Sequence, residues 1–142
     1  MQIPGHLAVA FAQYRGMPAR PPLKWLLLAS LFPDVVDKSI GYLLHLMPNG
    51  RHFAHNLFSL TATSALVGLV WGRTAGRAWF WGYLGHLLAD GNDRVPWLFP
   101  FRQYRFSRGR LRFKPAAMLV ESIFLAAVIL YPGGREFPRY KS

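Results

Sequence analysis

The sequence predicts an all-α protein, a small bundle of four to five apolar helices with a short basic hairpin or extended segment near residues 100–114. Apolar runs recur along the chain and are separated by short stretches rich in proline, glycine or arginine, which end helices. Alternation of cations with apolar residues, the period of a strand, marks the basic segment. The 142 residues suffice for one buried core and are too few for two, so we expect a single domain over residues 1–142.

Prolines delimit the first two expected helices. The apolar run Leu7–Ala12 is followed by a Pro/Arg-rich stretch, residues 15–22, which we expect to break the first helix. This run is shorter than the core of a signal peptide, so no cleaved targeting segment is expected. The second helix covers Leu23–Phe32, and we expect it to stop at Pro33.

Three further apolar runs predict the remaining helices. Ala54–Gly72 contains no charged residue, and Ala78–Leu88 is apolar again after a basic interruption at Arg73–Arg77. We expect two helices here, joined by a tight basic turn. The last helix is expected over Ala116–Tyr131, where Pro132 ends it.

The composition limits the class of protein. Apolar types make up 52% of the chain and charged types only 16%, against an average of about 25%, which excludes intrinsic disorder and argues against an ordinary water-soluble surface. The 17 Lys and Arg exceed the 6 Asp and Glu by 11, which favours lipid headgroups, nucleic acid or an anionic substrate as partners. Without cysteine, disulfides, thiolate nucleophiles and Cys-ligated zinc are excluded, so any metal site must use His, Asp and Glu.

The apolar runs raise the question of a membrane. Only Ala54–Gly72 reaches the length of a membrane span, so a transmembrane helix is expected there if anywhere, and the distribution of Lys and Arg gives no orientation. Short apolar helices with a basic rim suit a protein sunk partway into an anionic interface equally well. Its anchors at the headgroup level would be four tryptophans, Trp71, Trp79, Trp81 and Trp97. The alternative is a very apolar helical bundle whose tryptophans belong to the core.

The acidic residues are concentrated. Four of the six are Asp, and all four fall in two short stretches. Asp34 and Asp37 are three residues apart, and His86 and Asp90 are four apart, so each pair would share one face of a helix. Burial of such groups without partners costs several kcal/mol per charged group. A compensating partner is therefore expected.

Histidines complete this pattern. His52 and His55 repeat the three-residue spacing before the charge-free run, and His6 opens the first apolar run. A divalent ion would compensate these groups, because imidazole and carboxylate suit zinc, manganese or iron. Several Asp could hold two ions, which activate a water and hold a phosphoryl or ester oxygen. The predicted reaction class is metal-assisted hydrolysis.

Other interpretations apply to single residues. Asp34 follows a proline and could equally be the N-cap of a helix. His45 lies in an apolar stretch, and we expect it to be a core residue rather than a ligand. A Ser/His/Asp triad is a poor alternative, since no Ser lies in a Gly-x-Ser-x-Gly turn.

The order of these motifs resembles the YdjM-like family of inner-membrane-associated, metal-dependent hydrolases. The counterparts of the family's motifs here are Gly5-His6, Pro33-Asp34-Val-Val-Asp37, Arg51-His52-Phe-Ala-His55, Gly82-Tyr-Leu-Gly-His86-Leu-Leu-Ala-Asp90, and Pro100-Phe101 with Arg102 and Arg105. The resemblance covers His6 to about Phe106. The order is also similar to that of zinc-dependent phospholipase C, a helical fold, which supports phosphoester chemistry by analogy.

The resemblance implies a location at the bacterial inner (cytoplasmic) membrane, integral or interfacial. It implies a site for one or two divalent ions, with zinc preferred and manganese or iron as alternatives. The implied ligands are His6, Asp34, Asp37, His55, His86 and Asp90. Asp34 and Asp37 would divide two roles, bridging a metal and accepting a proton from the attacking water.

One motif departs from the family pattern. Gly50 stands where the family has a His before an Arg, and Ala54 and Asn56 replace the usual Thr and Ser around His55. His52 is therefore a further candidate ligand.

Three functions are expected to compete, and a transporter or channel is the least favoured of them, because 142 residues hold few membrane spans unless the protein oligomerises. In the first, the protein is a membrane-associated, metal-dependent hydrolase of an anionic ester or phosphoester, with a lipid as one candidate substrate. Membrane lipids are then its partners, and Arg51, Arg102 and Arg105 would bind the anion. In the second, it is a non-catalytic membrane protein whose metal holds the helices together and which binds a protein or nucleic acid. The basic segment, with a turn at Arg108-Gly109, could bind either lipid phosphate or a nucleic-acid backbone, the latter less favoured, or be a solvated hairpin.

Overall fold

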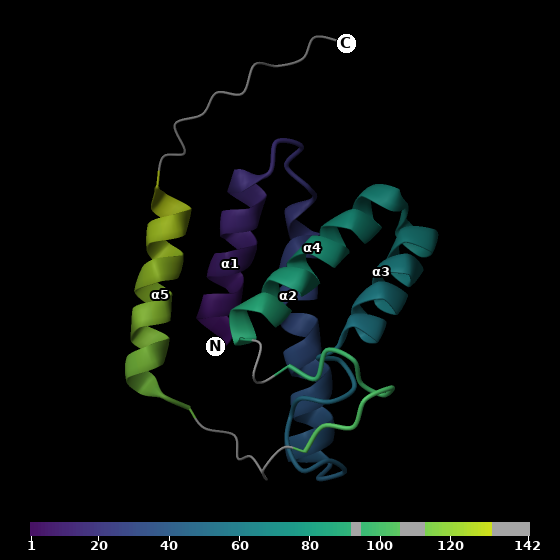
Figure 1. Cartoon of the computed structure of the whole chain (residues 1–142). Helices are drawn as coiled ribbons and strands as arrows, with labels where there is room; N and C mark the ends of the chain where they lie inside the picture. The colour runs from purple at the N-terminus through teal and green to yellow at the C-terminus, as the bar shows by residue number, and fades with distance from the viewer. Residues whose placement is uncertain (92–94, 106–112, 132–142) are drawn as a thin grey trace.

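The computed structural model describes residues 1–91, 95–105 and 113–131. Five α-helices and one π-helical turn make up its regular structure (Figure 1). They are α1 (Ile3–Gly16), α2 (Leu23–Lys38), η1 (Ser39–Leu43), α3 (Leu57–Trp71), α4 (Arg73–Asp90) and α5 (Pro115–Leu130). The described part of the chain contains no strand, so the predicted all-α class is confirmed.

Helices α2 and α4 form the centre of the bundle. Helix α3 packs against α4, whereas α1 contacts α2, α4 and α5. Figure 1 shows α3 and α5 at opposite edges of the bundle. The start of α1, the second half of α2 and the end of α4 thus meet at one level of the bundle.

Glycines bring the central helices into backbone contact. A Cβ atom on Gly82 of α4 would lie 2.4 Å from the carbonyl oxygen of Leu26 in α2, too close for any side chain. Gly76 meets Gly68 of α3 in the same way, at 2.7 Å. Aromatic side chains such as Tyr83, which is fully buried, fill the core beside these contacts. Because His86 lies one turn after Gly82, this approach also carries His86 to α2.

Helix α2 does not stop at Pro33, as the sequence suggested, but continues to Lys38. A proline inside a helix costs about 3 kcal/mol, so packing must offset this penalty. Pro33 is fully buried against its neighbours, which is where such compensation arises. The alternative in which Asp34 caps a helix is therefore wrong, since Asp34 lies within α2.

The connection between α3 and α4 also differs from the expectation. Arg73–Arg77 is the first part of α4 rather than a turn, and Gly72 alone joins the two helices. Gly72 has a φ of 92°, a conformation that glycine adopts without the strain a side chain would add.

Helix α3 is shorter than its apolar run. The side chain of Asn56 accepts a hydrogen bond from the Ser59 amide at 2.7 Å, which caps the helix, so the helix begins at Leu57. Its 15 residues extend for about 22 Å, whereas the apolar core of a bilayer is about 30 Å thick. In the portion of the chain described, no helix has both the length and the apolar character that crossing a membrane requires, which corrects the transmembrane helix expected over Ala54–Gly72.

Other expectations are met in part. Trp71 and Trp81 are exposed, as anchors would be, whereas Trp79 is buried and its indole N–H donates to Thr63 Oγ1 at 3.0 Å. His45 is exposed rather than in the core. Most of the predicted basic hairpin, residues 106–112 with its turn, lies outside the described residues; residues 102–105 form no strand.

Candidate metal centre

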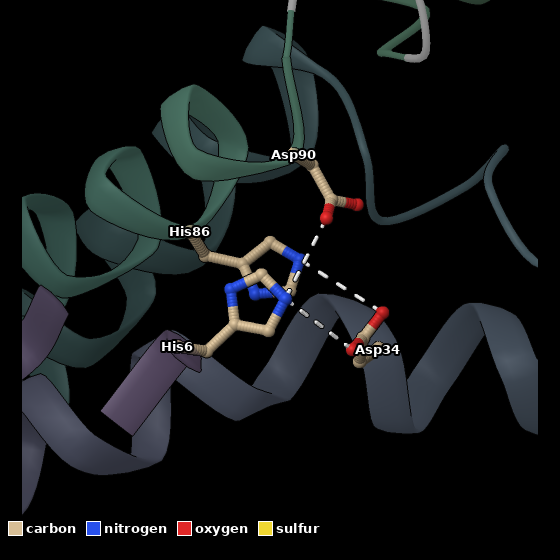
Figure 2. Close-up of side chains that lie close together, drawn as sticks. All are labelled: His6, Asp34, His86 and Asp90. Carbon is tan, nitrogen blue, oxygen red and sulfur yellow. Dashed lines mark ion pairs between the residues drawn. The ribbon is translucent and has the colours of Figure 1, made fainter. Parts of the chain in front are cut away.

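Four buried side chains from three helices converge at the level where α1, α2 and α4 meet. They are His6 of α1, Asp34 of α2, and His86 and Asp90 of α4 (Figure 2). Each offers one ligand atom, and these atoms all lie within 4.8 Å of one another. The widely separated histidines and aspartates of the sequence thus share one centre.

The distances fit a single bound ion. His6 Nε2 lies 3.7 Å from Asp34 Oδ2 and 3.6 Å from Asp90 Oδ1. His86 Nε2 lies 4.0 Å from Asp34 Oδ1. Ligand atoms around a tetrahedral zinc ion, each about 2.0–2.1 Å from the metal, are roughly 3.4 Å apart. The two His6 separations are within a few tenths of an ångström of that spacing, whereas the wider separations would have to shorten by about 1 Å.

His55 adds a further donor from the loop before α3. Its Nε2 lies 3.2 Å from His86 Nε2, and 3.6 Å from one oxygen of each carboxylate, Asp34 Oδ1 and Asp90 Oδ2. His55 is fully buried. Five of the six implied ligands are therefore together.

Asp37, the sixth, contacts the centre indirectly. Its carboxylate accepts hydrogen bonds from the amides of His52, Ala54 and His55, at 2.7 to 3.2 Å. It also accepts from His55 Nδ1 at 2.8 Å, which leaves His55 Nε2 facing the other donors. Carboxylates commonly orient metal-binding histidines in this way. The structure therefore places Asp37 as a group that positions His55 and its loop.

A second histidine is oriented by the backbone. His86 Nδ1 donates to the carbonyl oxygen of Ser30 at 2.6 Å, so its Nε2 carries the lone pair that faces the centre. The ring of His6 stacks on that of His86, with ring centroids 3.9 Å apart. Both rings thus point their Nε2 atoms at the carboxylates in Figure 2.

Unsatisfied polar atoms show that the residues fit a cation. Both ring nitrogens of His6, and Asp34 Oδ1, are buried without a hydrogen-bond partner. The great majority of buried polar groups in proteins are hydrogen-bonded, so each buried polar atom without a partner calls for an explanation. A divalent ion at the centre would satisfy His6 Nε2 and Asp34 Oδ1 at once.

The protonation states suit metal binding. Burial lowers the pKa of His6 to about 4 and that of His86 to about 3, so both rings are neutral at pH 7. Burial alone would raise the pKa of Asp34 and of Asp90, but the neighbouring His55 and nearby cations outweigh it and lower both. Neutral imidazoles and ionised carboxylates are the forms that bind metals.

His55 is the exception. Burial opposes its charged form, yet the nearby carboxylates of Asp34, Asp37 and Asp90 outweigh burial and raise the pKa of His55 to about 10. Without a metal, its proton therefore supplies positive charge among the three carboxylates.

Cations cover the centre on its outer side. Lys38 donates to Asp34 Oδ2, and Arg51 Nη2 lies 2.9 Å from Asp90 Oδ2. The terminal ammonium of Met1 lies 2.9 Å from Asp90 Oδ1. Sequence reasoning missed Lys38, although its position four residues after Asp34 on one helix was the available signal.

Comparison with known proteins now gives the family. The sequence pattern of the YdjM inner membrane protein family matches residues 1–137. The chain belongs to the YdjM family. No curated protein and no solved structure matches the chain. The match extends the predicted resemblance, which ended near Phe106, over almost the whole sequence.

The structure accounts for the altered motif of this YdjM family member. Asn56, in place of the usual Ser, caps α3 and donates to the carbonyl oxygens of His52 and Phe53 at 2.9 and 2.8 Å. Ala54 needs only its backbone, because its amide donates to Asp37 and its carbonyl accepts from the Tyr83 hydroxyl. The loop that carries His55 is therefore held without the family's hydroxyl side chains.

The remaining candidate residues lie around the centre. The ring of His52 packs edge-on against Phe99 and is not among the four clustered side chains. Arg102 lies over the ring of Tyr104 and is exposed, as is Arg105. Of the three predicted anion-binding arginines, the described contacts bring Arg51 to the centre.

Glu121 of α5 is a further residue that sequence reasoning missed. Its Oε2 accepts from the amides of Gln2 and Gly5 at 2.9 and 3.0 Å, at the start of α1. A carboxylate at a helix N-terminus satisfies free amides and the helix dipole. Because Gly5 precedes His6, Glu121 fixes the turn from which His6 reaches the centre.

Proposed function

We propose that this YdjM family member is a metal-dependent hydrolase that acts on an ester or phosphoester at the inner membrane. The observation that carries the proposal is the buried convergence of His6, Asp34, His55, His86 and Asp90. Three imidazoles and two carboxylates suit zinc, and also manganese or iron. One ion is the simplest content, and bridging by Asp34 would allow two.

A divalent ion bound there would supply a Lewis acid and a water activated at neutral pH. The chain's own residues provide the rest. His55 and His86 are held with their Nε2 atoms inward by Asp37 and by the Ser30 carbonyl. Of the two predicted proton acceptors, Asp34 is the one whose carboxylate faces the centre, because Asp37 is bound to the loop before α3.

The surface supports an anionic membrane as the site of action. Four carboxylate side chains belong to the described residues; three are buried, and the fourth, Glu121, is bound to α1. The described surface is therefore cationic. Large apolar side chains are also exposed, among them Leu119, Val120, Ile123 and Phe124 on α5. Cations together with exposed apolar side chains are typical of proteins that bind anionic lipid interfaces.

A second candidate function is a non-catalytic protein with a structural metal. It is favoured by one observation, that the centre joins α1, α2, α4 and the loop before α3, so a metal would cross-link four segments. In that case removal of the metal would unfold the protein, and no ester would be turned over.

The test compares two histidine variants of detergent-purified protein. His86→Ala should lose the bound metal, measured by elemental analysis, and lose hydrolysis of p-nitrophenyl phosphate, bis(p-nitrophenyl) phosphate and p-nitrophenyl acetate. His45→Ala is the matched control, because His45 is exposed, and it should keep both.

Retention of metal by His86→Ala would contradict the proposed centre. A wild-type protein that binds metal, hydrolyses none of these compounds and unfolds when the metal is removed would instead establish the structural role.

A further inference from the structure

Lys38 and Arg51 separate the buried carboxylates from solvent. Their side chains are 32% and 27% exposed, whereas those of their partners, Asp34 and Asp90, are 6% and 0% exposed. Each cation thus contacts the centre with its charged end and reaches the surface. They come from different segments, one from the end of α2 and one from the loop after η1.

The local structure brings the backbone next to Arg51 against Lys38. A Cβ atom on Gly50, next to Arg51 in the chain, would lie 3.1 Å from Cγ of Lys38 and 2.8 Å from the ring of Tyr42. A Cβ on Gly41 of η1 would lie 2.3 Å from the Asn49 carbonyl oxygen, so the loop packs directly on η1. The side chain of Asn49 then accepts from the Arg51 amide at 3.0 Å. Gly50, where the family has a histidine, is what permits this close packing.

We propose that Lys38 and Arg51 form an anion-binding pair on the exposed side of the metal centre, which selects substrates with a phosphoryl group over uncharged carboxylic esters. The inference rests on the proposed function and narrows its substrate class. It adds Lys38 to the site and pairs it with the arginine that the structure brings there.

The charges of the two side chains favour an anion at this position. Lys38 and Arg51 now pair with the same two carboxylates that would bind a divalent ion. When a cation occupies the centre, the carboxylates direct their charge to it, and the ammonium and guanidinium groups are left beside a positive site. A phosphoryl group offers several anionic oxygens, which suit the planar fork of Arg and the point charge of Lys. A neutral carboxylic ester carries no charge that these two cations could attract.

A purely structural role predicts something different. If these ion pairs only stabilised the fold, removal of one cation would weaken folding and leave anion binding unchanged. If instead Lys38 and Arg51 bind an anion and share their carboxylates with the metal, removal of Lys38 should reduce phosphate affinity. Metal affinity should then stay equal or rise. A loss of phosphate affinity without a loss of metal affinity therefore distinguishes an anion-binding role from a purely structural one.

The test uses inorganic phosphate as the probe and zinc-loaded full-length protein in detergent, studied by titration calorimetry. Lys38→Met and Arg51→Met should each weaken phosphate binding roughly ten- to hundredfold, the size expected for a charge-assisted hydrogen bond. Arg77→Met is the matched control, because Arg77 is exposed near the start of α4, far along that helix from His86. Lys38→Arg, which keeps the charge, should restore most of the binding.

Zinc content and thermal unfolding, measured on every variant, separate the outcomes. Equal phosphate affinity in wild type, Lys38→Met and Arg51→Met, with zinc retained and esters still hydrolysed, would overturn this inference and leave the proposed function intact. Absence of bound zinc in the wild type would overturn both. If a Met variant fails to fold, Lys38→Gln and Arg51→Gln replace it. The ratio of kcat/KM for p-nitrophenyl phosphate to kcat/KM for p-nitrophenyl acetate measures the preference for a phosphoryl group. A fall of this ratio in the variants, in parallel with phosphate affinity, supports the assignment.

Discussion

Replacement of Asp37 by asparagine tests how the centre is held together. The substitution keeps the shape of the side chain and removes its charge. Asp37 Oδ2 accepts from His52 N, His55 N and His55 Nδ1, whereas Oδ1 accepts from the Ala54 amide. In the Asp37→Asn variant, the amide oxygen of the new side chain can take over the three contacts of Oδ2. Its NH2 group would then face the Ala54 N–H, donor against donor.

These contacts set how much stability and metal affinity the Asp37→Asn variant should lose. An unsatisfied buried donor costs about 1–3 kcal/mol, and hydrogen bonds to a charged group contribute about 1.5–3 kcal/mol against about 1 for neutral ones. We therefore expect Asp37→Asn to lower the free energy of unfolding by about 2–4 kcal/mol. The orientation of His55 also depends on Asp37, so metal affinity should fall about 10- to 100-fold, as for other groups that orient metal ligands.

Two measurements check this prediction. Urea unfolding of metal-free protein gives the loss of stability, and competition with a chelating dye gives the zinc affinity. A variant that loses under about 1 kcal/mol, less than one unsatisfied donor should cost, and binds zinc as tightly as the wild type would refute the assignment of Asp37 as the group that positions His55.

Two further predictions follow from packing and from the surface. Gly82→Ala should destabilise the protein by about 1–3 kcal/mol in thermal or urea unfolding, because its Cβ would overlap the Leu26 backbone. Gly16→Ala is the control, since nothing lies within 4 Å of the added atom, and equal effects of the two variants would contradict the close contact of α2 and α4. Co-sedimentation should show binding to vesicles that contain phosphatidylglycerol, weaker binding to phosphatidylcholine alone, and weakened binding for the double variant Ile123→Ser, Phe124→Ser. Equal binding of wild type and double variant would exclude the exposed face of α5 from the lipid contact.

The charges of the centre explain why the residues that cover it are cationic. Three carboxylates, Asp34, Asp37 and Asp90, lie within a small buried volume beside two neutral imidazoles, His6 and His86. Without neighbouring positive charge, such a group of anions would carry a large desolvation cost. The protonated His55, Lys38 and Arg51 supply that charge. A divalent ion would replace the proton of His55 and free the two outer cations.

Local sequence pattern was sufficient wherever residues share one helix. The four-residue spacing of His86 and Asp90 predicted that both face the same side of one helix, and both reach the centre. The apolar runs predicted the number of helices. The predicted helix ends were wrong at single positions. Helix α2 continues through Pro33, where the sequence predicted its end. Asn56 and Gly72 flank α3 and make it shorter than the apolar run.

By itself, the sequence determined the helical class and the His and Asp residues from which the centre is drawn, because helical periodicity and composition are local properties. Tertiary structure alone decided that Asp37 binds a loop rather than the centre, that Arg51 lies beside Asp90, and that Glu121 secures the turn before His6. Those contacts join residues up to 119 positions apart. Their partners are set by how closely the helices pack, through contacts such as that of Gly82 with Leu26, and no local period encodes such distances.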